Sequence, residues 1–178
     1  MTKHSIDPWR FLVRDFPLHR LQLFCLALCM GLFPSMVIAA SKPAPFQATI
    51  SFTEEVSPPT DSSSPCLLIG TIAGQGVATK LDPVYLDSTD CIVPLSATVF
   101  LFSSQQVVLT DKDGHEIWAT YGGTLSLLTG AITGAYFIHG GTGPYSSAKG
   151  AGTINGFESL NPGTGGTGQI QLRGTLSN

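Results

Sequence analysis

Apolar and polar residues alternate along most of the chain beyond residue 40. In FQATISF (46–52), Phe46, Ala48, Ile50 and Phe52 share one parity, which places them on one face of an extended strand. No stretch of a dozen residues carries apolar positions at helical spacing. The pattern predicts an all-β protein of short, regularly spaced strands, as in a barrel or a sandwich. The expected strands are 46–52, 66–74, 76–81, 95–102, 105–110, 115–121, 124–128, 131–139, 149–157 and 168–176.

Three segments between these strands are interpreted as connections. SPPTDSSSP (57–65) is rich in proline and serine, which is typical of a loop. DPVYLDSTD (82–90) is polar and contains a proline, so we interpret it as a second loop. DKDG (111–114) separates two apolar runs and is a strong signal for a hairpin turn.

The first forty residues differ in kind from the rest. Arg10, Arg14 and Arg20 precede an apolar run that ends in Ala39 and Ala40, the layout of a secretory signal. An uncleaved membrane anchor is the alternative, because the run is about long enough to span a bilayer. We expect residues 1–40 to be a cleaved signal peptide and the mature protein to be secreted or periplasmic.

The remaining 41–178 are expected to form one domain, in which 41–65 supply an N-terminal strand and a Pro/Ser-rich loop and 66–178 supply the main body. This part holds ten acidic and five basic residues. Such a balance offers no electrostatic footprint for nucleic acid or anionic lipid. We therefore expect no nucleic-acid partner and, after signal cleavage, no membrane association.

Two cysteines, Cys66 and Cys91, remain after the expected cleavage. In an exported chain, an isolated pair of cysteines favours a disulfide over a metal site. The histidines that remain, His115 and His139, have no second ligand at metal spacing. The sequence therefore predicts a disulfide, no metal ion and no cofactor.

A glycine-rich stretch, FIHGGTGPYSSAKGAG (137–152), invites functional interpretations that its context does not support. A phosphate-binding loop needs a following helix, and none is expected here. The SxxK pattern at 146–149 lacks the partner motifs of penicillin-binding enzymes. We interpret Gly140, Gly141 and Gly143 as a structural turn, with Tyr145 turned inward as an aromatic plug.

The same stretch carries a family resemblance. FIHGGTGPYSSAKGAGTING (137–156) resembles the glycine hairpin of dirigent proteins and of allene-oxide-cyclase-like barrels, above all of a secreted bacterial group among them. Cys66 before GTIAGQGVATKL, the TDC that ends at Cys91, and LTDKDGHEIWATYGGT also resemble that group. Pro144 stands where the group usually has arginine, so no role of that arginine is transferred.

The resemblance covers about residues 66–176 and implies an eight-stranded antiparallel β-barrel, which is a calycin-like architecture. Dirigent proteins steer radical coupling and the cyclases guide ring closure, both by holding a reactive small molecule in a barrel cavity. Three functions stay open: an exported barrel that holds a small apolar molecule, a cyclase or dirigent-type enzyme, and an interaction module acting through surface loops such as 53–65 and 82–91. Whether the protein is an enzyme, and its oligomeric state, also stay open.

Four residues are candidates for the lining of such a cavity: Glu116, Tyr121, Tyr136 and Arg173. Tyr121 and Tyr136 would present an aromatic ring with a polar tip. Glu116 and Arg173 could orient a ligand if their strand faces point inward. The alternation favours the opposite orientation for these two, because Ile117 and its neighbours of the same parity suit a core better.

Overall fold

The computed structural model describes residues 42–161 and 163–178, which form a single all-β body. The expected signal peptide lies outside the described residues. Within them, no helix is long and apolar enough to cross a membrane. The eight strands are β1 (Ala44–Ser57), β2 (Leu68–Ala78), β3 (Leu81–Ser96), β4 (Val99–Asp111), β5 (Glu116–Ser126), β6 (Ala131–Gly141), β7 (Lys149–Asn161) and β8 (Gly165–Ser177).

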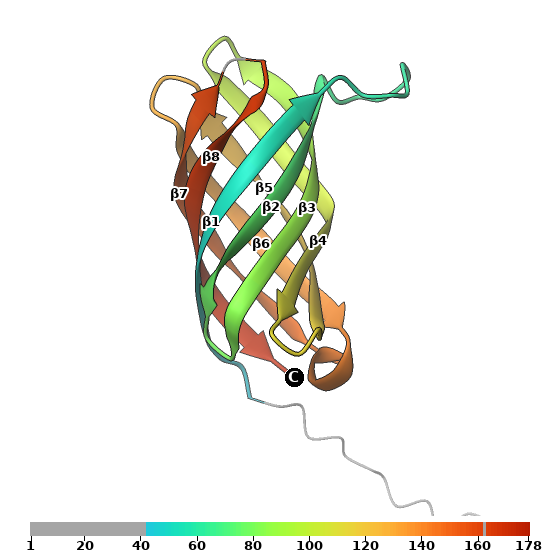
Figure 1. The fold of residues 1–178 in the computed structure, drawn as a ribbon, viewed down its shortest axis with the longest axis vertical. Coiled ribbons are helices and arrows are strands. Elements are labelled where there is room, and N and C mark those ends of the chain that lie inside the picture. Colours follow the sequence, from blue (N-terminus) through green and yellow to red (C-terminus); the bar gives the residue numbers. More distant parts are fainter. Residues whose placement is uncertain (1–41, 162) are drawn as a thin grey trace, which may run out of the picture. The chain divides into compact units, whose positions relative to one another are not determined.

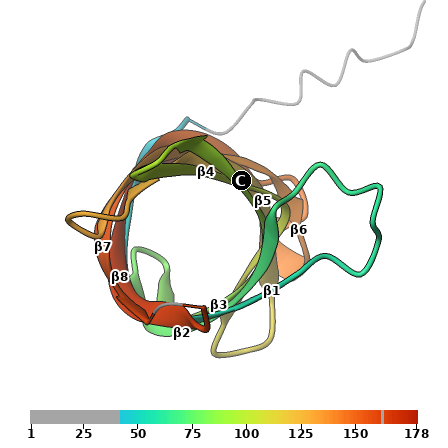
Figure 2. The same cartoon turned by 90° about the horizontal axis from the view of Figure 1, so that it is seen from above.

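Each strand pairs antiparallel with the next one in sequence, and β1 pairs with β8, so the sheet closes into a barrel. Figure 1 shows the strands tilted around the barrel axis, and Figure 2 looks along that axis at the closed ring. Closure leaves neither β1 nor β8 as an unpaired sheet edge. The expected eight-stranded antiparallel barrel is confirmed.

The strands are longer than the alternation alone predicts. The expected strands 66–74 and 76–81 are replaced by β2, which runs without interruption to Ala78. The segments 95–102 and 105–110 are largely joined in β4, whose register shifts between Ser104 and Val107. Such an irregularity breaks the period of two locally, and for this reason the pattern indicated two strands where there is one.

The interpretation of 82–90 as a loop is wrong, since this segment is the first part of β3. Val84, Leu86, Ser88 and Asp90 alternate inward, while the residues between them are exposed. A strand whose inward positions include a serine and an aspartate resembles a polar loop in sequence. Of the two surface loops proposed for an interaction module, 82–91 is therefore strand, and 53–65 is a loop only beyond Ser57, where β1 ends.

Buried side chains fill the barrel at the end where β1, β3 and β5 begin, which is the lower end in the orientation of Figure 1. Large residues from the lower strand ends are almost completely buried there, namely Phe46, Leu81, Val84, Ile117 and Leu176. Tyr145, on the short 3-10 helix η2 (Gly143–Tyr145), is also buried, and its hydroxyl donates a hydrogen bond to the Lys80 carbonyl at 3.1 Å. This end is therefore closed by packing, with Tyr145 as the expected plug.

The glycine-rich stretch is a backbone device, but its glycines serve different purposes. Gly140 and Gly141 end β6, and only Gly143, with φ +52°, uses the left-handed region. A Cβ on Gly141 would collide with the Glu116 carbonyl and with Tyr145, so Gly141 permits a close approach of two backbones. The turn therefore depends on space at Gly141 and on conformation at Gly143.

The upper end carries the disulfide, which joins Cys66 to Cys91 with Cα atoms 5.2 Å apart. This confirms the expected pairing. Beside it, the Leu67 amide donates to the Ile92 carbonyl at 2.8 Å. The bridge therefore fixes the end of the 58–67 loop to β3 at the mouth of the barrel.

We expect the double variant Cys66→Ser/Cys91→Ser to lose about 3 kcal/mol of unfolding free energy, since the bridge closes a loop of about two dozen residues in the unfolded chain. Urea titrations of the oxidised wild type and the variant measure the loss. Wild type treated with a reductant is the control and should match the variant. Equal stability of oxidised wild type and variant would contradict this expectation.

Candidate functional site

A cavity occupies the upper half of the barrel interior. The cavity has a volume of about 50 Å³ accessible to water, and its empty space amounts to about 560 Å³ when the open solvent at its mouth is counted. That is room for several waters or for a narrow small molecule. Its apolar walls come from all eight strands and consist of Phe52, Ile72, Leu86, Ile92, Phe100, Phe102, Leu125, Ile132, Ile154 and Ile170.

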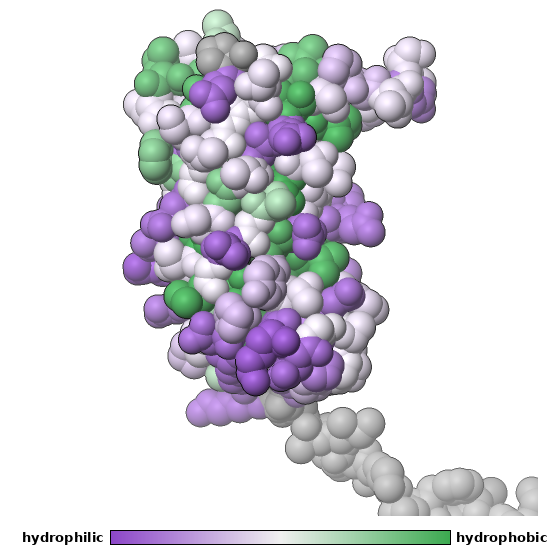
Figure 3. All heavy atoms as spheres, in the orientation of Figure 1, coloured by the Kyte–Doolittle hydropathy of each residue, from purple (hydrophilic) through white to green (hydrophobic). Residues whose placement is uncertain are grey.

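The loops around the mouth carry exposed leucines. Leu67 is the last residue of the long β1–β2 loop, Leu95 is the penultimate residue of β3, and Leu127 and Leu128 lie between β5 and β6. Leu128 is 78% exposed and Leu95 is 60% exposed. In Figure 3 hydrophobic surface gathers toward this upper end, whereas the lower end is predominantly hydrophilic. An apolar molecule entering the cavity would thus pass over apolar side chains.

Three carboxyl groups line this apolar cavity, and sequence analysis missed all of them. Glu54 comes from β1, Asp90 from β3 and Glu158 from β7, and each is at most 8% exposed. Each continues the inward parity of its strand: Glu54 follows Phe52, and Glu158 follows Ile154. That parity was the available signal, because an acidic residue at an inward position predicts a buried carboxyl.

Glycines on the intervening strands let these carboxyls converge. Gly70 on β2 lies between the strands of Glu54 and Asp90, and Gly166 on β8 lies between those of Glu54 and Glu158. A Cβ on Gly70 would collide with Oε1 of Glu54, and one on Gly166 with Oε1 of Glu158. The two carboxyl groups therefore occupy space that a side chain at either glycine would fill.

Asp90 is held in place by two hydroxyl groups. Tyr121, on β5, donates to Oδ1 of Asp90 at 2.6 Å, and Ser88 donates to the same oxygen at 3.0 Å. The Tyr121 ring packs edge-on against Phe102, with ring centroids 5.7 Å apart. Charge-assisted hydrogen bonds of this kind stabilise the ionised carboxylate. Oδ2 of Asp90 takes part in neither bond.

Burial raises the pKa of all three acids. It raises the pKa of Glu54 from 4.5 to about 8, with further contributions from the charge of Glu158 and from a hydrogen bond with it. Burial also raises the pKa of Glu158, although the hydrogen bond with Glu54 opposes this. At neutral pH Glu54 and Glu158 therefore share a proton.

Asp90 differs from this pair. Burial raises its pKa to about 6, and the bonds from Tyr121 and Ser88 limit the rise. The pKa of Tyr121 is raised in turn by its own burial and by the charge of Asp90, so Tyr121 keeps its proton. At pH 7 the cavity thus contains an ionised carboxylate, Asp90, beside a carboxyl pair that holds a proton. Acid–base catalysis uses such a difference between the pKa values of neighbouring groups.

The four candidate residues that the sequence suggested for the cavity do not lie together. Tyr121 lines the cavity, whereas Tyr136 is buried against Phe46 with ring centroids 6.2 Å apart and does not line it. Burial raises the pKa of Tyr136 to about 12, and its hydroxyl has no hydrogen-bond partner among the described residues.

Glu116 and Arg173 do not line the cavity, so they are no longer candidates for binding a ligand there. Glu116 accepts a hydrogen bond from Nε1 of the exposed Trp118 at 2.7 Å. Arg173 is exposed and donates to Oε1 of Gln171 at 3.1 Å. Both side chains lie on the outer face, as the strand alternation favoured.

One group of potential metal ligands lies outside the cavity, in the β4–β5 turn. Ligand atoms of Asp111, Asp113 and His115 lie within 4.8 Å of one another. Oδ1 of Asp111 accepts the backbone amides of Asp113 and His115, both at 2.9 Å. These bonds give Asp111 the structural role that an aspartate has at the start of a tight turn.

Comparison with solved structures identifies the class of fold. The structure of the pterocarpan synthase dirigent protein GePTS1 matches with a TM-score of 0.52 at 10% sequence identity, over 83% of this chain and 98% of that one. The protein therefore has a dirigent-like barrel, and at this identity the likeness extends to the fold alone. No protein-family model and no curated protein matches the sequence.

We expect stability to fall by about 2 kcal/mol between pH 6.5 and pH 8.5. The native state holds a proton on Glu54 that the unfolded chain has already released, so stability is lost as the pH rises toward and past 8. Most of the titration of Asp90 lies below this window. Urea titrations at the two pH values measure the change.

Glu54→Gln should largely abolish this dependence, because the amide does not titrate. Glu55→Gln is the matched control: Glu55 is the next residue of β1 and is exposed on the outer face. A wild type as stable at pH 8.5 as at pH 6.5 would contradict the assignment of a shared proton to the Glu54–Glu158 pair.

Proposed function

We propose that the protein holds a small, largely apolar molecule in the upper half of its barrel and acts on it by proton transfer, as a cyclase or dirigent-type enzyme that guides ring closure or coupling. One observation carries this proposal: Asp90, at the wall of an apolar cavity, is ionised at neutral pH and positioned by Tyr121 at 2.6 Å. A carboxylate with little water around it is a stronger base toward a bound molecule than one in water.

The residues have distinct roles in this proposal. Asp90 is the general base, and its Oδ2 is the oxygen that Tyr121 and Ser88 leave available. Tyr121 and Ser88 are positioning residues, since they hold the carboxylate and limit its pKa. The Glu54–Glu158 pair offers a ligand either a proton or a negative charge. The apolar wall orients the rest of the molecule.

A pure interaction module is less well supported. That alternative requires a barrel packed solid, whereas here only the lower half is filled. A carrier that only binds an uncharged apolar molecule would need the cavity but not three acids inside it. Burying carboxyl groups is costly, and structures tend to retain such groups where they serve a function.

The base can be tested without knowledge of the natural substrate. 5-Nitrobenzisoxazole is a small apolar molecule whose ring opens when a base removes the proton from its C3 carbon: the N–O bond breaks and a coloured phenolate forms. We expect the purified protein to accelerate this reaction, with a rate that rises as Asp90 ionises near pH 6. Asp90→Asn should lower the rate by at least about tenfold, because general-base catalysis typically contributes a hundredfold or more.

Two variants complete the test. Asp87→Asn is the matched control and should leave the rate unchanged, because Asp87 lies on the same strand with an exposed side chain. Tyr121→Phe should move the pH profile to higher pH, because it removes a bond that holds down the pKa of Asp90. An Asp90→Asn protein as active as wild type would refute the role given to Asp90.

A further inference from the structure

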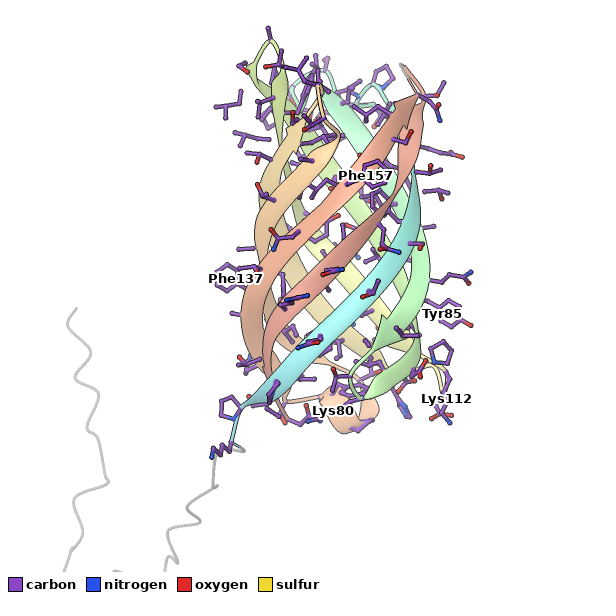
Figure 4. All side chains as sticks on the ribbon, turned by 90° about the vertical axis from the view of Figure 1, so that its left-hand side faces the viewer. Lys80, Tyr85, Lys112, Phe137 and Phe157 are labelled. Carbon is purple, nitrogen blue, oxygen red and sulfur yellow. A yellow bond between two sulfur atoms is a disulfide. The ribbon has the colours of Figure 1, made fainter. Side chains whose placement is uncertain are left out.

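The cavity that contains three acids contains no basic side chain. The described part of the chain has five lysines and arginines, all of them exposed: Lys42, Lys80, Lys112, Lys149 and Arg173. None of them lines the cavity. Figure 4 shows Lys80 and Lys112 near the lower, closed end of the barrel. The interior carboxyls therefore have no counter-charge from the described residues.

Glu158 provides an independent sign of an occupant. Its side chain lines the cavity and is only 3% exposed, and among the described residues its Oε1 has no hydrogen-bond partner apart from the proton shared with Glu54. If Glu54 and Glu158 are both ionised, no described residue donates to this oxygen. A buried acceptor without a donor is rare in folded proteins, because it loses its bonds to water without replacement. A ligand that donates hydrogen bonds and carries positive charge would satisfy it.

The surroundings of the acids favour an organic cation over a bare metal ion. Among the described residues, the group whose ligand atoms are placed to hold a metal ion is Asp111, Asp113 and His115, and the three interior carboxyls do not form such a group. The walls are instead rich in aromatic rings, from Phe52, Phe100, Phe102 and Tyr121. Aromatic faces and apolar walls suit a ligand with a cationic head and an apolar body.

We infer that the occupant of the cavity is an organic ammonium compound, a primary amine with an apolar body, whose –NH3+ group binds between Glu54 and Glu158. This inference rests on the proposed function, which places a small molecule in the cavity, and it assigns the chemical class of that molecule. The ammonium donates to both carboxylates, including Oε1 of Glu158, while the apolar body lies along the aromatic wall and toward Asp90.

Charge balance makes a distinctive prediction. The Glu54–Glu158 pair shares one proton at neutral pH, and an ammonium ion requires both carboxylates to be ionised. Binding therefore takes in one positive charge and releases up to one proton to the solvent. Below pH 8 the affinity should then rise by about tenfold for each pH unit, because proton release and binding are linked. The amine itself stays protonated throughout, as a lysine does.

Three probes of nearly the same shape test the inference. These are 2-phenylethylammonium, the neutral 2-phenylethanol and the anionic phenylacetate. Isothermal titration calorimetry at pH 7, in two buffers with different ionisation enthalpies, gives both the affinity and the number of protons released. We expect the ammonium to bind at least about tenfold more tightly than the alcohol and to release a proton, and phenylacetate to bind least.

Two variants locate the ammonium. Glu158→Gln should weaken binding of 2-phenylethylammonium by at least about tenfold and leave that of 2-phenylethanol unchanged. Glu54→Gln should abolish proton release. Glu55→Gln, with its exposed side chain on the same strand, is the control and should change neither quantity. If an interior variant does not fold, the pH dependence and proton release of the wild type still decide the inference.

The outcomes separate this inference from the proposed function. Equal affinity for the ammonium and the alcohol, without proton release, would overturn the inference and leave an apolar binding cavity in place. Tightest binding of phenylacetate would also overturn it. If none of the three probes binds, the cavity does not take up small molecules of this kind, and the proposed function fails together with the inference.

Discussion

The pairing of β1 with β8 is the interaction on which the rest of the structure depends. It extends from Ala44 opposite Leu176 to Glu55 opposite Gly165 and turns a sheet into a closed barrel. Closure gives the protein an interior, and it also sets Glu54 on β1 opposite Gly166 on β8. Without that pairing, Glu54 would lie on one edge strand of an open sheet and Glu158 on the strand next to the opposite edge.

The same closure explains why acids can be buried here. An open sheet can turn one face to water, whereas an inward position in a barrel is surrounded by other strands. Packed side chains fill the lower half, whereas the three acids lie in the upper half and face the cavity. The resulting conflict between carboxyl groups and an apolar wall is confined to a few positions, and local inconsistencies of this kind are expected at functional sites.

Most of the fold could be predicted from the sequence, because alternation along strands is strong in this chain. The all-β class, the Cys66–Cys91 bridge and the inward aromatic Tyr145 follow from residue patterns, whereas the choice of a closed barrel over a sandwich came from the family resemblance. The site was harder to find, since Asp90 lies in a strand whose inward residues are partly polar, and composition made that strand resemble a loop. Glu54 could have been predicted from the alternation, because it is the next inward position after Phe52, but it lies beyond the end of the apolar segment 46–52.

The packed lower half has a consequence for exchange. Because Phe46, Tyr145 and their neighbours fill that end, a molecule bound beside Asp90 would have to leave by the mouth through which it entered. Binding and release would use the same opening, so a second molecule could bind only after the first had been released. The residence time of the bound molecule would then limit the rate of turnover. The exposed leucines around the mouth are the side chains best placed to change that residence time.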